Sequence, residues 1–127
     1  MKITSIDHVQ LAMPSGRELD AEFFYSEVLG MSVVPKPEAL QRRGGRWFKS
    51  GTAQIHLGVD SGFTAVKKAH PGIVVEGFDE LVERLKSFNI NFVLDDEIPQ
   101  LRRMYVEDPF GNRIEIIDQR SLSDLPY

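Results

Sequence analysis

The sequence predicts an α+β fold in which one βαβββ unit is used twice. Both halves of the chain show the same order, a strand pattern, an amphipathic helix and three further strand patterns, with Gly and Pro clusters between them. Each half alone is too small to bury one face of its sheet. Pairing the halves would join two sheets around a shared concave space. The alternative is an ordinary α+β sandwich in which the repeated order is a coincidence.

The first half begins with residues 3–13, which are rich in β-branched and apolar residues and stop at the turn signal Pro14-Ser15-Gly16. Residues 17–29 carry the apolar pairs Leu19/Phe23 and Phe24/Val28 at i,i+4 spacing, with charges between them, which predicts an amphipathic helix ended by Gly30. Three strands are then expected at residues 31–34, 47–49 and 53–59.

The second half repeats this order. A strand is expected at residues 72–76, followed by a helix at residues 78–88 whose apolar residues form one stripe. Three further strands are expected at residues 90–94, 104–107 and 113–118, and residues 108–112 (Asp-Pro-Phe-Gly-Asn) predict the tight turn between the last two. In that turn Gly111 supplies the positive φ.

Length and composition limit the organisation and the partners. With 127 residues, the chain predicts one domain over residues 1–127, with module 1 at about 1–60, module 2 at about 70–120 and a C-terminal tail at 121–127. The net charge of -4 and the lack of a basic cluster argue against nucleic acid as a partner. No apolar run approaches the roughly 20 residues that cross a bilayer, and no signal segment is evident, so a cytoplasmic protein is expected. The absence of cysteine excludes disulfides and thiolate ligands.

The metal-type residues fall at equivalent places in the two halves. His8 and His70 each open the first strand of a half, and His56 and Glu115 each lie inside its last strand. The intervals agree, since 48 residues separate His8 from His56 and 45 separate His70 from Glu115. Two equivalent pairs related by a duplication are expected to converge on one point.

The surroundings of these residues favour a metal. Glu115 lies between Ile114 and Ile116, where an unpaired carboxylate would be costly to bury. His56 lies in a similar apolar setting, between Ile55 and Leu57. One divalent ion would neutralise the carboxylate and accept the imidazole lone pairs. Imidazole and carboxylate ligands suit Zn, Ni, Fe, Co or Mn. Taken one at a time, these residues would more often face solvent or form hydrogen bonds in a core.

Four segments of the chain resemble the vicinal oxygen chelate superfamily, which includes glyoxalase I, bleomycin-resistance proteins and extradiol dioxygenases. These segments are IDHV at residues 6–9, FFYSEVLGM at 23–31, AHPGIVVEGFDELVERL at 69–85 and YVEDPFGNRIEII at 105–117. The resemblance implies paired βαβββ modules that form an open, curved mixed sheet around a metal-binding cleft. It also implies metal ligands from the first and last strands of each module, which here are His8, His56, His70 and Glu115.

Glyoxalase I-like members usually carry Glu at the position of His56, and epimerase-like members carry Gln. Bleomycin-binding members usually lack the ligands, so retention of all four favours a metal-dependent role. The resemblance implies a glyoxalase-like lyase or isomerase whose metal binds a small substrate through adjacent oxygens, with Glu115 as catalytic base. The alternatives are an Fe(II) extradiol-type dioxygenase, a non-enzymatic antibiotic- or metabolite-binding protein and, more weakly, a fosfomycin-type thiol transferase.

Contacts to the small-molecule substrate are expected from the middle strands. The candidates there are Arg46, Trp47, Arg103 and Tyr105. The two arginines are expected to occupy matching places in the halves, so that one could bind an anionic group of the substrate. Exposed apolar strands in so short a chain favour a homodimer, within which the site could be completed by one chain or by two.

Overall fold

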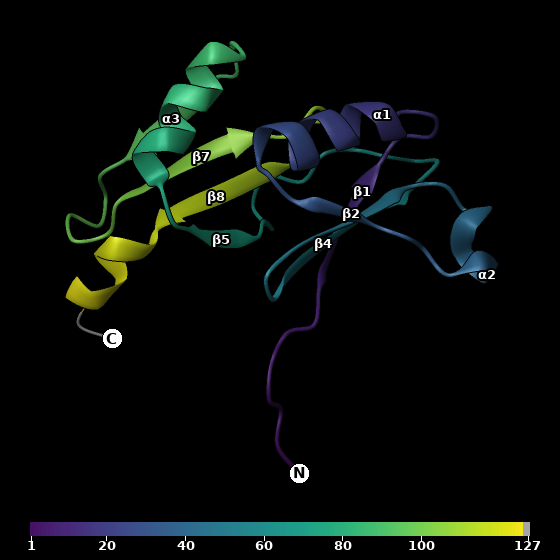
Figure 1. Ribbon diagram of the computed structural model, residues 1–127, viewed down its shortest axis with the longest axis horizontal. Helices are drawn as coiled ribbons and strands as arrows, with labels where there is room; N and C mark the ends of the chain where they lie inside the picture. The colour runs from purple at the N-terminus through teal and green to yellow at the C-terminus, as the bar shows by residue number, and fades with distance from the viewer. Residues whose placement is uncertain (126–127) are drawn as a thin grey trace. The chain divides into compact units, whose positions relative to one another are not determined.

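The computed structural model of the chain describes residues 1–125 and divides into two compact units, unit 1 (Met1–Thr64) and unit 2 (Ala65–Tyr127). Each unit contains one open, four-stranded mixed sheet and at least one helix (Figure 1). Each follows the βαβββ order, which confirms the two-module fold class that the sequence predicts.

Unit 1 contains a sheet of strand order β1-β4-β3-β2, in which β1 and β4 run parallel and the other neighbours run antiparallel. Its strands are β1 (Val9–Met13), β2 (Ser32–Val34), β3 (Arg46–Ser50) and β4 (Ala53–Val59). Its helices are α1 (Glu18–Ala21), the π-helix η1 (Glu22–Val28) and α2 (Glu38–Gln41).

Unit 2 has the same topology, with strand order β5-β8-β7-β6 and a parallel β5–β8 pair. Its strands are β5 (Gly72–Val75), β6 (Phe92–Asp95), β7 (Arg103–Glu107) and β8 (Arg113–Asp118). Its helices are α3 (Phe78–Ser87) and the 3-10 helix η2 (Gln119–Asp124).

The core of each unit lies between its sheet and its long helix. In unit 1 the rings of Tyr25, on η1, and Phe48, on β3, stack with centroids 5.2 Å apart, and both side chains are fully buried. In unit 2 the fully buried Phe78 and Leu85 of α3 pack on the side of the sheet that carries Met104 and Ile116. Alternate residues of β3, β4, β7 and β8 point away from the helix, because successive side chains in a strand face opposite sides. One face of each sheet is therefore left for other contacts.

Two predicted elements differ from those observed. The first strand begins at Val9 rather than residue 3, and residues 1–8 are exposed and form no regular structure, because no neighbouring strand offers them backbone partners. The helix predicted at residues 17–29 is a short α-helix that continues as a π-helix. The apolar i,i+4 pattern of the sequence does not indicate the i→i+5 hydrogen bonds of a π-helix. Gly30 follows this helix with φ of +77°, as the sequence predicts for its end.

Other boundaries move by one or two residues, and two short helices, α2 and η2, are not predicted by the sequence. η2 occupies most of the predicted C-terminal tail 121–127, whose last two residues lie outside the described part of the chain. The strands at residues 53–59 and 113–118 are confirmed with their predicted bounds. Along residues 1–125, no helix is both long and apolar enough to cross a membrane.

The turn between β7 and β8 is confirmed as well. Asp108 Oδ1 accepts hydrogen bonds from the backbone N–H groups of Phe110 (2.9 Å) and Asn112 (2.8 Å), and Gly111 has φ of +89°. The Asn112 amide also donates to Asp108 Oδ2 at 2.9 Å. Both polar side chains are buried and satisfy each other, so their role in this turn is structural.

A buried carboxylate joins the end of β8 to α3. Asp118, with 3% of its side chain exposed, pairs with Arg120 (Nη2–Oδ2 2.8 Å) and with Arg102 (Nη1–Oδ2 3.4 Å). Both arginines also pair with Asp79 in the first turn of α3. The hydrogen bond from the Arg120 guanidinium holds the pKa of Asp118 below its usual value, although burial alone would raise it.

We expect Asp118→Asn to lower the free energy of unfolding at neutral pH by about 2 kcal/mol, because it removes charge-assisted hydrogen bonds from a buried site. A carboxyl with a depressed pKa contributes stability above its unfolded pKa of about 3.9 and loses it as the pH falls through the folded pKa. The difference between wild type and variant should therefore shrink below about pH 4. Urea unfolding across pH tests this, with the exposed Asp96→Asn as control; a difference that does not depend on pH would contradict it.

Candidate metal centre in two half-sites

The strand registers place the four predicted ligands at equivalent positions. In unit 1, His56 pairs with Gln10 across the parallel strands, and His8 lies two residues before Gln10. In unit 2, Glu115 pairs with Gly72, and His70 lies two residues before Gly72. We call these two pairs of predicted ligands half-sites, namely His8 with His56 in unit 1 and His70 with Glu115 in unit 2.

The half-site of unit 2 has the spacing of two ligands on one ion. His70 Nε2 and Glu115 Oε2 are 3.3 Å apart, and only 20% and 14% of the two side chains are exposed. Two ligand atoms about 2.1 Å from a common ion, at octahedral or tetrahedral angles, lie roughly 3.0 to 3.4 Å apart. The pair fits a metal ion without any rearrangement of these two atoms.

Hydrogen bonding of the His70 ring supports the same conclusion. Its Nδ1 lies 2.9 Å from the carbonyl oxygen of Lys68, and because a carbonyl can only accept, the hydrogen must be on Nδ1. In the neutral ring, Nε2 then presents a lone pair toward Glu115 Oε2, which is also an acceptor. Two acceptors that face each other at 3.3 Å require a cation between them, either a proton or a metal ion. A backbone carbonyl on the distal ring nitrogen is the usual support of a metal-binding histidine.

Glu115 is supported in its turn by an ion-pair chain. Arg103 Nη1 donates to Glu115 Oε1 at 2.8 Å, and Arg103 Nη2 pairs with Asp95 Oδ2 at 2.5 Å. Burial alone would lower the pKa of the Arg103 guanidinium, but its hydrogen bonds to Glu115 and Asp95 raise it overall. At neutral pH the two carboxylates and one guanidinium leave one net negative charge beside His70, which favours a cation.

The half-site of unit 1 is built as an aromatic stack. The His56 ring lies between His8 and Trp47, with ring centroids 4.1 and 3.9 Å away and interplanar angles of 13° and 6°. His8 Nδ1 lies 2.9 Å from Asp7 Oδ2, a carboxylate that can fix the ring with Nε2 free. His56 Nε2 has only Gln54 Oε1 at 3.5 Å, the outer limit of a hydrogen bond.

The stack limits how unit 1 can bind a metal. An imidazole binds a metal in its own plane, and two nearly parallel stacked rings direct their lone pairs along separate planes. His8 and His56 therefore cannot both bind one ion in the arrangement observed. Burial, and then the charge of His8, lower the pKa of His56, which keeps its ring neutral. Neither unit by itself brings three or more His, Asp or Glu side chains together as a metal site in the described residues.

Trp47 and Tyr105, two of the predicted substrate contacts, are also equivalent. Trp47 pairs with His56 across β3 and β4, and Tyr105 pairs with Glu115 across β7 and β8. Each aromatic side chain therefore lies beside a predicted ligand, on the face of its sheet away from the helix. The ring of Tyr105 also meets the ring of His70 edge to face, with centroids 5.7 Å apart.

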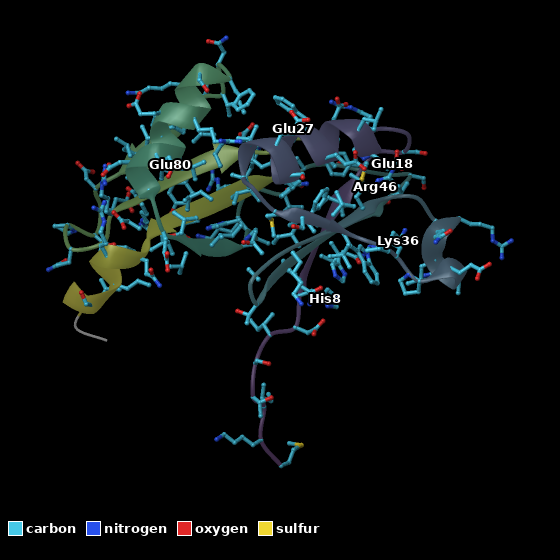
Figure 2. The ribbon with its side chains drawn as sticks, viewed as in Figure 1. His8, Glu18, Glu27, Lys36, Arg46 and Glu80 are labelled. Atoms are coloured by element: carbon cyan, nitrogen blue, oxygen red, sulfur yellow. The ribbon has the colours of Figure 1, made fainter. Side chains whose placement is uncertain are left out.

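The expected equivalence of Arg46 and Arg103 is not observed. Arg46 pairs with Leu57, one residue after His56, and so points to the helix side, where its Nε donates to Glu22 at 2.8 Å. Figure 2 shows Arg46 beside α1, near Glu18, and His8 on the segment that leads into β1. Arg103 pairs with Ile117, two residues after Glu115, and so shares the face of Glu115. A shift of one residue moves a side chain to the other face of a strand.

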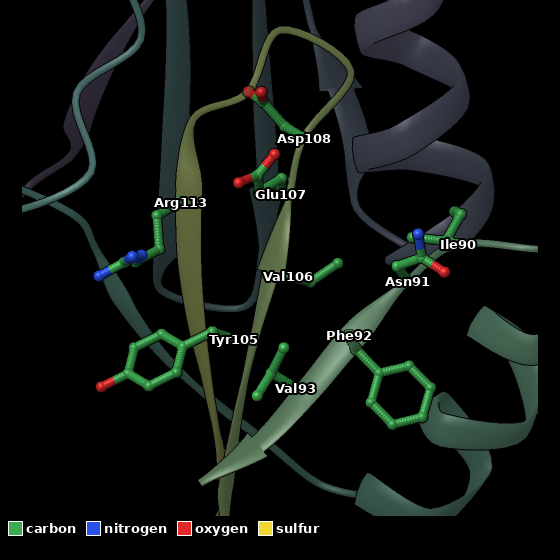
Figure 3. Close-up of a pocket in the computed structure, with 9 residues that line it drawn as sticks. All are labelled: Ile90, Asn91, Phe92, Val93, Tyr105, Val106, Glu107, Asp108 and Arg113. Carbon is green, nitrogen blue, oxygen red and sulfur yellow. The ribbon is translucent and has the colours of Figure 1, made fainter.

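A cavity of about 500 Å³ lies next to the half-site of unit 2. It is lined by Ile90, Asn91, Phe92, Val93, Tyr105, Val106, Glu107, Asp108 and Arg113 (Figure 3). Tyr105 connects the cavity to His70, and the guanidinium of Arg113 lies 5.4 Å from the centre of its ring. Arg113 and Asp95 lie near the half-site, although the sequence pattern does not single them out. The alternation Arg113-Ile114-Glu115 was the available signal for the former, but Asp95 lies on another strand, opposite Arg103, and only the register reveals it.

Comparisons with known proteins agree with the fold and the topology. The family model of the Glyoxalase/Bleomycin resistance protein/Dioxygenase superfamily matches residues 5–116. A crystal structure of a protein from Bacillus anthracis, described as belonging to the glyoxalase family, is 47% identical; the match covers 93% of this chain and 97% of that chain, with a TM-score of 0.90. No curated protein matches the chain.

More distant structures share the fold alone. Lactoylglutathione lyase from Agrobacterium tumefaciens is 21% identical with a TM-score of 0.69, and the match covers 95% of this chain and 98% of that chain. The fosfomycin resistance protein FosX from Listeria monocytogenes is 13% identical with a TM-score of 0.72, and the match covers 94% of this chain and 98% of that chain. The duplicated βαβββ topology, the family match and the 47% identical structure together show that the chain belongs to the Glyoxalase/Bleomycin resistance protein/Dioxygenase superfamily.

Proposed function

We propose that the protein is a metal-dependent lyase or isomerase that acts on a small substrate with two adjacent oxygen atoms. The observation that carries this proposal is the pair of His70 Nε2 and Glu115 Oε2, which lie 3.3 Å apart, the spacing of two ligands on one ion. Members of the superfamily generally use a divalent metal ion and bind small molecules, which supports the same function. Zn, Ni, Fe, Co and Mn all suit this ligand chemistry.

In this proposal the two half-sites contribute to one metal site, either within one chain or across a dimer. His70 and Glu115 bind the ion from unit 2, and His8 and His56 are the candidate ligands from unit 1. When bound, the ion supplies Lewis-acid stabilisation of negative charge that develops on the substrate oxygens. To act as base, Glu115 would release the ion transiently; Oε2 would then take the proton from the substrate carbon and return it, because Oε1 is already engaged by Arg103.

The aromatic residues and the cavity of unit 2 are proposed to bind the substrate. Trp47 and Tyr105 lie beside the proposed ligands in equivalent registers, so their rings can line the reaction site. The cavity next to Tyr105 provides room for a part of the substrate remote from the reacting atoms. Arg113 at this cavity offers a cation to an anionic group, whereas Arg46 lies on the helix side and is not included in this role.

The metal ligands are tested by elemental analysis and by competition with a chromophoric chelator. We expect the wild-type protein to bind about one divalent ion per chain. Changes around a ligand typically cost 10- to 100-fold in metal affinity, so loss of the ligand itself in His70→Ala should cost more than about 100-fold. Glu83→Gln, on the exposed side of α3, is the control and should bind as wild type does. Wild-type protein with no measurable affinity for any of the five metals would contradict the proposal.

The role of Glu115 is tested by Glu115→Gln. The amide oxygen can still bind an ion but cannot take a proton, so we expect metal content to be largely retained and turnover to fall by about 100-fold or more. The substrate to use is the hemithioacetal formed from a 2-oxoaldehyde and a small thiol, in the presence of each metal in turn. Full turnover in a metal-loaded Glu115→Gln protein would exclude Glu115 as the base.

An Fe(II) extradiol-type dioxygenase is the second candidate function, and the stack in unit 1 favours it. If only one of His8 and His56 can bind, the ligand set is two histidines and one carboxylate, which is the set of non-haem Fe(II) oxygenases. Because Asp7 orients His8 with Nε2 free, His8 is the better candidate for that single ligand.

His56→Ala distinguishes the two ligand sets. With three ligands, His56→Ala should retain the ion within about 10-fold of wild-type affinity, whereas His8→Ala should lose it. Loss of metal in His56→Ala would instead indicate four ligands and favour the isomerase. Oxygen uptake with catechols and Fe(II), compared with turnover of the hemithioacetal, then assigns the reaction; full activity with zinc alone excludes the dioxygenase.

A cytoplasmic homodimer completes the proposal. The edge strands β2 and β6 carry exposed apolar side chains, with Val33 44%, Val93 66% and Leu94 59% exposed. Monomeric proteins usually protect such edges. We expect light scattering to give twice the chain mass of 14.4 kDa, and Val93→Lys to shift the protein toward the monomer. A mass of one chain at all concentrations would exclude the dimer.

A further inference from the structure

We propose that Arg103 is a positioning residue: it binds Glu115 through Oε1 and thereby leaves Oε2 as the oxygen that binds the proposed metal ion. This inference rests on the proposed function, because it assigns a role to a residue that contacts a proposed ligand. It replaces the expectation that Arg103 binds an anionic group of the substrate.

The geometry separates the two oxygens of Glu115. Arg103 Nη1 donates to Oε1 at 2.8 Å, while Oε2 faces His70 Nε2 at 3.3 Å. A carboxylate bound in this way can offer only one free oxygen to an ion, so Arg103 favours binding through Oε2 alone.

Arg103 is itself fixed from the opposite side. Asp95 on the neighbouring strand β6 accepts from Nη2 at 2.5 Å, and Asp95 and Arg103 pair directly across β6 and β7. Both terminal nitrogens of the guanidinium are therefore engaged by carboxylates, and only 13% of the Arg103 side chain is exposed. Little of the guanidinium surface is left for a substrate anion.

The chain of ion pairs from Asp95 through Arg103 to Glu115 resembles the hydrogen bonding that holds metal-binding carboxylates in place. Carboxylates that bind metals are commonly hydrogen-bonded by outer residues, which fix their orientation, and loss of such a residue typically costs 10- to 100-fold in affinity. In unit 2 the support runs from Asp95 to Arg103 to Glu115 on one side, and from the Lys68 carbonyl to His70 on the other. Both atoms that face the proposed ion are thereby fixed from behind.

The test is the affinity of the full chain for Zn²⁺ and Co²⁺, measured by competition with a chromophoric chelator, together with the visible spectrum of the Co²⁺ form. We expect Arg103→Met to lower the affinity by about 10- to 100-fold and to change the Co²⁺ spectrum, since Glu115 can then rotate. Arg102→Met is the matched control: Arg102 pairs with Asp79 and Asp118 away from Glu115, so its affinity and spectrum should be those of wild type.

Two further variants guard against loss of folding. Arg103→Met leaves Asp95 without its partner, so the double variant Asp95→Asn/Arg103→Met removes that unpaired charge and should show the same loss of metal affinity as Arg103→Met. Asp95→Asn alone keeps the Arg103–Glu115 pair and should show a smaller loss. Circular dichroism identifies the folded variants on which the affinities are compared.

The outcomes separate this inference from the proposed function. Wild-type protein that binds neither ion defeats the proposed function and, with it, the inference. Normal binding in wild type with unchanged affinity and spectrum in the folded Arg103 variants defeats only the role of Arg103. An increase in KM for an anionic substrate at unchanged kcat, with unchanged metal affinity, would assign Arg103 to substrate binding and likewise overturn the inference.

Discussion

The register between the first and last strands of each unit is the constraint on which the site depends. Parallel pairing of β1 with β4 and of β5 with β8 sets which side chains share a face. In β8, Glu115 points away from α3 because its neighbours Ile114 and Ile116 are fully buried on the helix side. A slip of one residue would bury Glu115 in the core and expose both isoleucines, so the hydrophobic core itself keeps Glu115 at the candidate site.

The same register determines the charge of the half-site in unit 2. Asp95, Arg103 and Glu115 meet because three neighbouring strands place them on one face. Two carboxylates around one guanidinium leave a negative charge, and burial makes that charge costly without a cation. If this half-site binds an ion as proposed, the unfavourable electrostatic energy of the ion-free protein would become part of the binding free energy.

Much of this arrangement could be predicted from the sequence. Strand β8 has its predicted bounds, and His8 and His70 prove equivalent in register because the duplicated pattern preserves their distance from the first strand. The convergence of the two half-sites on one ion stays a prediction.

Other features depend on interactions that a one-dimensional pattern does not contain. The strand propensity of residues 3–8 has no effect without a neighbouring strand, and the i,i+4 pattern of residues 17–29 does not distinguish an α-helix from a π-helix. The sequence pattern assigned Arg46 and Arg103 matching places, but Arg46 precedes Trp47 by one residue, whereas Arg103 precedes the equivalent Tyr105 by two. The two arginines therefore point to opposite faces of their sheets. Asp95 could not be identified, because it meets Arg103 only across a strand pair.

The two half-sites differ in how far they are organised in advance. In unit 2, hydrogen bonds from Arg103 and to the Lys68 carbonyl orient the proposed ligands Glu115 and His70. In unit 1, His8 precedes its strand on an exposed segment, and stacking fixes its ring parallel to His56 rather than toward a common point. Ordering a side chain on binding reduces affinity, so two pairs in equivalent registers need not contribute equally. The duplication places the two pairs of proposed ligands in equivalent registers, and the residues around each pair differ between the halves and determine how firmly its side chains are oriented.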